Sequence, residues 1–275
     1  MSIAEVFARA SSESRAALIG YLPAGYPSTP ESHDLVRAMI EGGVDAIEVG
    51  MPYSDPVMDG PAIQAAADIS LAQGTTLDDA IAVVRTVAQS GAAGCLMSYW
   101  NPIERYGVER FSEAFAAAGG TAVITPDLSP EEAGPWRTAT DSHHIGRVFL
   151  VAPSSRDQRL ASVASLCSGF VYAASTMGVT GNDIEVGQTA RTLVQRVRGV
   201  TDLPVAVGLG IRTGAQARAV AEYADGVIVG SAFVRAVAGA DSPAARCDAV
   251  RALATELAVG CRRSAPVARE AEEDS

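Results

Sequence analysis

Three carboxylates between residues 48 and 59 could perform acid–base chemistry. Glu48 lies in the run DAIEVG of residues 45–50, which has the composition of a short buried strand. Because strand side chains alternate between two faces, Ile47 and Val49 share one face and Glu48 takes the other. Burial in a barrel would raise the pKa of such a carboxyl group towards neutrality, which suits a general acid–base. The alternative is a structural glutamate bonded to the backbone or to an arginine.

The loop after this run, residues 51–61 with the sequence MPYSDPVMDGP, carries the other two carboxylates, Asp55 and Asp59. It is longer than the roughly two to six residues usual between a strand and the next helix. An Asp-Gly-Pro sequence often marks the start of a helix, with the aspartate as its cap. Two roles therefore stay open for Asp59, a helix cap and a second catalytic carboxylate.

Three later segments are rich in glycine and each follows a short apolar run. They read MGVTG at residues 177–181, GLGI at 208–211 and GSA at 230–232. Glycine lets the backbone approach an anion, and the N–H groups and dipole of a helix N-terminus favour it, so phosphate can bind there without a basic side chain. Any single glycine pair could simply form a tight turn, but three in successive loops indicate a phosphate site.

The chain has no lysine, because all 21 of its basic residues are arginines. A Schiff-base aldolase and a pyridoxal phosphate enzyme both need a lysine amine, so neither chemistry belongs to this chain. Its only histidines are His33, His143 and His144, and adjacent histidines on a strand point to opposite faces, so we expect no metal site. Carboxylates, tyrosines and backbone dipoles must therefore carry the chemistry.

Composition excludes several other classes of protein. A net charge of −11 with a pI of about 4.7 argues against a nucleic-acid binder. No apolar run reaches the roughly 18 residues that a membrane helix needs, and residues 1–14 do not have the layout of a signal peptide, so a cytoplasmic protein is expected. The four cysteines form no CxxC pair and are expected to be free, mostly buried thiols.

Short apolar runs alternate with segments of helical period along the whole chain. The expected strands cover residues 17–22, 46–49, 94–99, 122–124, 147–151, 170–173, 204–207 and 226–229. The expected helices that follow them cover residues 30–42, 76–90, 108–118, 130–140, 158–167, 186–200, 214–223 and 244–259. Alternating βα units imply a parallel sheet, and eight of them at this length predict a closed (β/α)8 TIM barrel.

The predicted barrel is an α/β fold in one domain, residues 1–262, with a disordered acidic tail at 263–275. The alternative, an open doubly wound sheet, would need a GxGxxG turn after the first strand, where residues 23–27 read PAGYP. In a barrel the carboxyl ends of the strands carry the function, so Glu48 and the glycine loops should meet there. The residues alone thus indicate a phosphate-binding barrel lyase or isomerase.

Residues 48–64, EVGMPYSDPVMDGPAIQ, resemble a long signature of the tryptophan synthase alpha chain family. The similarity continues at residues 99–102, 126–128, 178–181, 208–211 and 230–232, and spans about residues 20–234. The sequence departs from the family at Met58, where a small residue is common, at Trp100, at Thr176-Met177 and at Leu209.

The resemblance implies a lyase that cleaves indole-3-glycerol phosphate into indole and glyceraldehyde 3-phosphate, on a barrel with extra short helices, one of them at residues 61–73. Glu48 would be the principal acid–base and Asp59 the second catalytic carboxylate. The implied phosphate ligands are Gly181, Gly210, Gly230 and Ser231. The implied wall of the indole and glycerol pocket is Tyr21, Ile63, Tyr99, Tyr172, Thr180 and Leu209.

The resemblance also implies a partner, the β subunit of an α2β2 heterotetramer, which would hold pyridoxal phosphate and turn indole into tryptophan. This chain itself would hold no cofactor. The loop of residues 51–59, with Pro52, Tyr53 and Met58 as exposed apolar groups, would face that partner unless these side chains pack back on the barrel.

Three other functions fit parts of the sequence. One is a different phosphate-binding barrel of tryptophan or histidine biosynthesis, although indole-glycerol phosphate synthase chemistry usually needs a lysine. Another is a non-catalytic barrel kept as an allosteric partner, against which the intact Glu48 and Asp59 argue. The last is a free-standing lyase that releases indole without a partner, which the sequence does not exclude.

Overall fold

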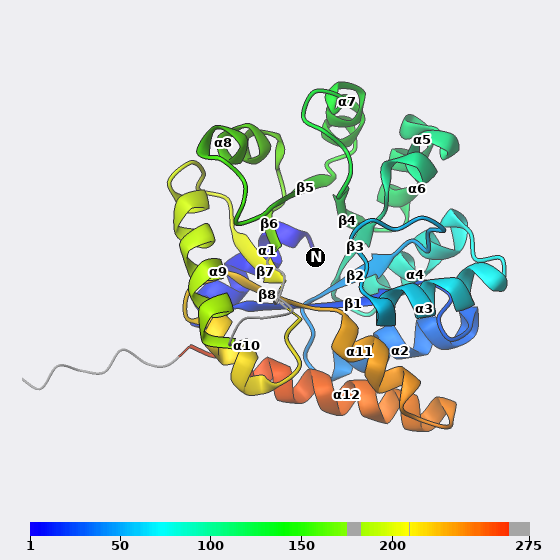
Figure 1. Ribbon diagram of the computed structural model, residues 1–275. Helices are drawn as coiled ribbons and strands as arrows, with labels where there is room; N and C mark the ends of the chain where they lie inside the picture. The colour runs from blue at the N-terminus through cyan, green and yellow to red at the C-terminus, as the bar shows by residue number, and fades with distance from the viewer. Residues whose placement is uncertain (175–182, 209, 264–275) are drawn as a thin grey trace, which may run out of the picture.

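The structure is a computed structural model that describes residues 1–174, 183–208 and 210–263. Within these residues eight parallel strands pair in chain order, and the last pairs with the first to close a barrel (Figure 1). The strands are β1 (Ala17–Pro23), β2 (Ala46–Gly50), β3 (Ala93–Met97), β4 (Gly120–Ile124), β5 (Gly146–Val151), β6 (Val171–Ala174), β7 (Val205–Gly208) and β8 (Gly226–Val229). The predicted TIM barrel and the position of every predicted strand are confirmed, with shifts of up to two residues at the ends.

One outer helix follows each strand, and together these helices form the ring around the barrel in Figure 1. They are α2 (Thr29–Glu41), α4 (Leu77–Gln89), α6 (Val108–Ala117), α7 (Gly134–Ser142), α8 (Asp157–Leu166), α9 (Asp183–Arg198), α10 (Gly214–Ala221) and α12 (Pro243–Gly260). The additional helices are α1 (Ile3–Ser12), α3 (Pro61–Ala72), α5 (Trp100–Tyr106) and α11 (Ser231–Ala238). The extra helix expected at residues 61–73 is therefore present as α3.

The start of α7 was predicted wrongly. A helix was expected at residues 130–140, but residues 130–132 form a turn and the helix starts at Gly134. The Ser129 hydroxyl donates to the Glu132 carboxylate at 2.8 Å instead of capping a helix, and a second proline stands in the first turn of the real helix. His143 and His144 lie at the end of α7 and not on a strand.

Two apolar layers follow from the alternation of strand side chains. Ile47 and Val49 belong to the cluster that joins the barrel to the outer helices, whereas Ala46 belongs to the cluster inside the barrel. Helix α1 closes the inner cluster at the amino ends of the strands, where Phe7 packs against Phe170 with their ring centroids 5.5 Å apart. The opposite, carboxyl ends of the strands are left for the loops, and this is where Glu48 lies.

The expectations from composition concern the cysteines, membrane helices, metal sites and the C-terminal tail. Cys95, Cys167 and Cys261 are buried free thiols, and Cys247 is a half-buried one. No described helix is long and apolar enough to cross a membrane. Among the same residues no group of three or more His, Cys, Asp or Glu side chains could hold a metal ion. Residues 264–275 of the predicted tail lie outside the described part of the chain, so the domain boundary remains a prediction.

Candidate active site

Glu48 is buried at the carboxyl end of β2, with only 2% of its surface exposed. In the barrel it lies between Tyr21 of β1 and Cys95 of β3, its register partners. Its Oε1 atom has no hydrogen-bond partner among the described residues, so the structural alternative of a glutamate held by arginine or backbone is not supported. Burial, with a smaller contribution from the negative charge of Asp59, raises the pKa of Glu48 to about 8. The resting side chain is therefore mostly a neutral acid at pH 7.

Asp59 does not cap the helix that follows it. The cap position of α3 is Gly60, which has no side chain to accept a hydrogen bond, and Pro61 begins the helix. The Asp59 carboxylate instead lines the same cavity as Glu48, and its backbone carbonyl accepts a 2.6 Å hydrogen bond from the side-chain amide of Gln64. Partial burial raises the pKa of Asp59. Of the two roles open from the sequence, the geometry favours a second carboxylate in the cavity.

Tyr99 holds the loop that carries Asp59. Its hydroxyl accepts hydrogen bonds from the backbone N–H groups of Val57 at 3.0 Å and Met58 at 3.2 Å. Its ring stacks on Tyr53, with centroids 4.9 Å apart. Tyr99 was expected in the pocket wall, but it lies beside the cavity and is not among the residues that line it. Its contacts fix the backbone one residue before Asp59.

The exposed apolar groups of this loop differ in part from the expected ones. Pro52 is buried and Tyr53 is half-buried against Tyr99, so both pack back on the barrel. Val57 and Met58 are exposed, at 78% and 48% of their surfaces. Asp55 is also exposed, accepts a 2.5 Å hydrogen bond from the Ser54 hydroxyl, and does not line the cavity.

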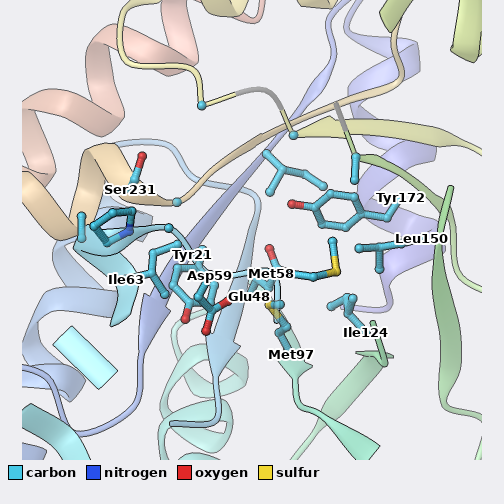
Figure 2. A pocket seen from close by; sticks show the side chains of 18 of the residues that line it. Tyr21, Glu48, Met58, Asp59, Ile63, Met97, Ile124, Leu150, Tyr172 and Ser231 are labelled. Carbon is cyan, nitrogen blue, oxygen red and sulfur yellow. The ribbon is translucent and has the colours of Figure 1, made fainter. Parts of the chain in front are cut away.

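The cavity at the barrel mouth has a volume of about 290 Å³. Among the described residues, those that line it are Tyr21, Glu48, Met58, Asp59, Gly60, Pro61, Ala62, Ile63, Met97, Ile124, Leu150, Tyr172, Ala174, Gly208, Gly210, Ile228, Gly230, Ser231 and Arg235. Figure 2 shows Tyr21, Glu48 and Asp59 gathered on one side, with Tyr172 and Leu150 facing them across the opening. The arrangement offers an apolar slot with two carboxylates on one wall, which suits a flat aromatic substrate.

Two glycines make room for the tyrosines of this wall. A side chain at Gly50 would overlap the Tyr21 ring, and one at Gly208 would overlap the Tyr172 ring. Burial, and secondarily the nearby carboxylates, raises the pKa of both phenols well above 10, so both stay protonated and can donate hydrogen bonds. The strand-end glycines of the sequence thus serve close packing as well as any contact with phosphate.

Three of the four expected phosphate ligands, Gly210, Gly230 and Ser231, lie in the described part of the chain. Gly230 and Ser231 stand at the N-terminus of α11, and Gly210 has a φ of 66°, a conformation that favours glycine. All three line the cavity, as does Ile63. The other expected ligand, Gly181, and the expected wall residues Thr180 and Leu209 lie outside the described residues.

The apolar residues Met97, Ile124 and Leu150 line the cavity but were not singled out from the sequence. They are inward-facing residues near the carboxyl ends of β3, β4 and β5, the same kind of position that Glu48 occupies on β2. Strand alternation, applied to each strand end in turn, would have found them. Arg235 also lines the cavity and was not predicted from the sequence. Its spacing of one helical turn from Ser231 could have identified it as a neighbour of that residue.

Comparisons with known proteins show the family to which the chain belongs. The family model described as "Tryptophan synthase alpha chain" matches residues 7–262. The tryptophan synthase alpha chain of Thermobifida fusca is 58% identical over 261 residues, which cover 94% of this chain and 97% of that one. The protein of the same name from Mycobacteroides abscessus is 54% identical over 262 residues, which cover 95% of this chain and 98% of that one.

Solved structures give the same result. The structure of Mycobacterium tuberculosis tryptophan synthase matches with a TM-score of 0.88 at 50% identity, covering 94% of this chain and 98% of that one. Tryptophan synthase subunit alpha from Legionella pneumophila matches with a TM-score of 0.85 at 29% identity, covering 95% of this chain and 98% of that one. The chain therefore belongs to the tryptophan synthase alpha chain family, carbon–carbon lyases that cleave indole-3-glycerol phosphate into indole and glyceraldehyde 3-phosphate.

Proposed function

We propose that Glu48 and Asp59 perform this cleavage in the cavity at the barrel mouth. The observation that carries the proposal is a buried Glu48 carboxyl group whose pKa is raised to about 8 and which shares the cavity with Asp59. A group with a pKa near the working pH can both give and take a proton efficiently. The absence of lysine from the chain leaves this acid–base route in place of an imine.

In the proposed reaction, protonated Glu48 donates its proton to C3 of the indole ring. The ring becomes an indolenine with positive charge on its nitrogen. The resulting carboxylate then takes the proton of the C3′ hydroxyl group of the glycerol chain. The electron pair of that O–H bond forms the aldehyde C=O, the C3–C3′ bond breaks, and its electrons restore the aromatic ring. Glu48 ends protonated, as it began.

Asp59 is proposed to stabilise the positive charge that develops on the ring nitrogen. A carboxylate that is already oriented before the reaction needs little reorganisation, and its effect is strongest where water is excluded. The contacts of Tyr99 with the backbone at Val57 and Met58 and the bond from Gln64 to the Asp59 carbonyl supply this orientation. The phosphate group is proposed to bind Gly210, Gly230 and Ser231 through backbone N–H groups, together with Gly181.

Replacing Gly210 with valine is expected to raise the KM for indole-3-glycerol phosphate about tenfold, the effect of losing a charge-assisted hydrogen bond. The substitution puts a branched side chain at a φ of 66° beside the proposed phosphate position. Steady-state kinetics of indole release measures the change. The matched control is Gly74→Val, since Gly74 has a φ of 77° with open space around it and does not line the cavity. Equal KM values for the two variants would contradict the phosphate site.

We also propose that the chain works in a complex with a tryptophan synthase β subunit, which supplies pyridoxal phosphate and receives the indole directly. A biosynthetic enzyme of this kind would act in the cytoplasm. Exposed Val57 and Met58 lie just before Asp59 in the chain, so a partner that covers them could order the catalytic carboxylate. That link gives partner binding a way to change the rate.

The experiment that tests the function is an indole-release assay on indole-3-glycerol phosphate while a β subunit is titrated in. Indole should form with the chain alone, and the rate should rise to a plateau as the complex seen by ultracentrifugation saturates. No indole under any condition would refute the lyase mechanism. A full rate without any complex would instead support the free-standing lyase that the sequence left open.

A further inference from the structure

Arg235 is a cavity residue without a role in the proposed mechanism. It lies on α11, one turn after Ser231, and lines the cavity. Its guanidinium donates a hydrogen bond to the Ser231 hydroxyl oxygen, with Nη1 and Oγ 3.1 Å apart. Helix α11 therefore presents to the cavity its own N-terminus, a serine hydroxyl and a cation bonded to that hydroxyl.

This hydrogen bond determines whether the Ser231 hydroxyl can act as a donor to a ligand. A guanidinium has five donors and no acceptor, so Ser231 Oγ must accept this bond through a lone pair. The hydroxyl hydrogen is then free to point elsewhere. In a cavity that binds a phosphate, an oriented hydroxyl is a donor ready for a phosphate oxygen.

The charges that line the cavity also favour a role for Arg235 in binding phosphate. Its described wall contains two carboxyl groups, those of Glu48 and Asp59, and one cationic side chain, that of Arg235. A phosphate monoester adds a charge of about −1.5 to −2 at pH 7. The chain as a whole has a net charge of −11, so it offers this anion no general attraction. A cation beside the phosphate site would offset that repulsion locally.

We propose that Arg235 is a positioning residue for the substrate phosphate: it orients the Ser231 hydroxyl as a donor and supplies the local positive charge. The inference rests on the proposed phosphate site at Gly210, Gly230 and Ser231. It assigns the affinity for the phosphate group partly to a side chain, in addition to backbone N–H groups. Because the phosphate does not react, Arg235 affects KM and leaves kcat unchanged.

The test compares Arg235→Gln with Arg235→Lys and with Arg218→Gln in indole-release kinetics, using the whole chain with its β subunit. Arg218 is the matched control, since it is exposed in the last turn of the eight-residue helix α10, as Arg235 is in α11, and does not line the cavity. Each arginine also interacts favourably with the dipole of its own helix, so Arg235→Gln and Arg218→Gln both lose that contribution. Inorganic phosphate serves as a second probe, as a competitive inhibitor that has no indole ring.

Arg235→Gln is expected to raise the KM for the substrate and the inhibition constant of inorganic phosphate by about tenfold each, with kcat unchanged. Arg235→Lys should recover part of both effects because it keeps the charge, and Arg218→Gln should match the wild type. The wild-type KM should also rise with ionic strength more steeply than that of Arg235→Gln.

Ser231→Ala separates this inference from the phosphate site itself. If Ser231→Ala raises KM while Arg235→Gln leaves both constants unchanged, the role of Arg235 is refuted and the site stands. If both variants leave KM unchanged while Gly210→Val raises it, backbone N–H groups alone hold the phosphate and the inference is refuted. If Gly210→Val also leaves KM unchanged, the proposed phosphate site is wrong and the inference falls with it. A fall in kcat at unchanged KM for Arg235→Gln would also overturn the inference, because it would place the residue in the chemical step.

Discussion

Glu48→Gln is expected to lower kcat for indole release by about 10² to 10⁴, the usual contribution of a general acid–base. Glutamine keeps the size of the side chain but can neither give a proton to C3 of the indole nor take one from the C3′ hydroxyl. The KM should change little, because the substrate contacts remain. The control is Glu104→Gln, which makes the same exchange on an exposed position of α5 outside the cavity. Near-wild-type turnover by Glu48→Gln would refute the assignment.

The raised pKa of Glu48 also predicts how stability and activity depend on pH. The folded-state pKa of Glu48 is raised from an ordinary value of 4.5 to about 8, so the folded chain holds this proton more tightly than the unfolded chain. Its contribution to stability is therefore fully present below about pH 4.5 and is lost as the pH rises through about 8. The melting temperature of Glu48→Gln relative to the wild type should increase between about pH 6 and about pH 9. Wild-type kcat/KM should fall above about pH 8 as the acid form is lost.

Asp59→Asn is expected to lower kcat by about 10² to 10³ with little change in KM, as for other groups that stabilise charge formed in the transition state. Asparagine fits the same space but does not carry the negative charge that the developing indolenine needs. Rapid-quench measurement of indole formation would show whether the chemical step itself is slowed.

Asp55→Asn is the matched control on the same loop. Asp55 is exposed and its carboxylate accepts a hydrogen bond from the neighbouring Ser54. The kcat of Asp55→Asn should therefore equal that of the wild type. Tyr99→Phe provides a graded comparison, because it removes the oxygen that accepts the N–H groups of Val57 and Met58 while leaving the Asp59 charge in place. The decrease in kcat caused by Tyr99→Phe should be smaller than the decrease caused by Asp59→Asn. If Asp55→Asn and Asp59→Asn were equally slow, the loop as a whole and not its second aspartate would be the catalytic element.

The sequence by itself determined the barrel and the face that Glu48 occupies. Strand alternation is a local property of the backbone, so residues 45–50 were enough to separate Ile47 and Val49 from Glu48. Composition likewise excluded imine chemistry, since a chain without lysine has no side-chain amine to form one. The helix start expected at residue 130 was wrong because a serine followed by a proline fits a turn as well as a helix cap, and only the following chain decides between them.

The tertiary structure decided what the local pattern could not. Whether Glu48 is a structural ion or an acid depends on which side chains converge on it from other strands, and none of the described groups bonds its Oε1. Whether Asp59 caps α3 or enters the cavity depends on the path of its loop, which Tyr99 fixes from more than forty residues away in sequence. Desolvation, charge balance and loop position arise only when distant segments meet, so these properties of the site come from the closed barrel and not from any one stretch of sequence.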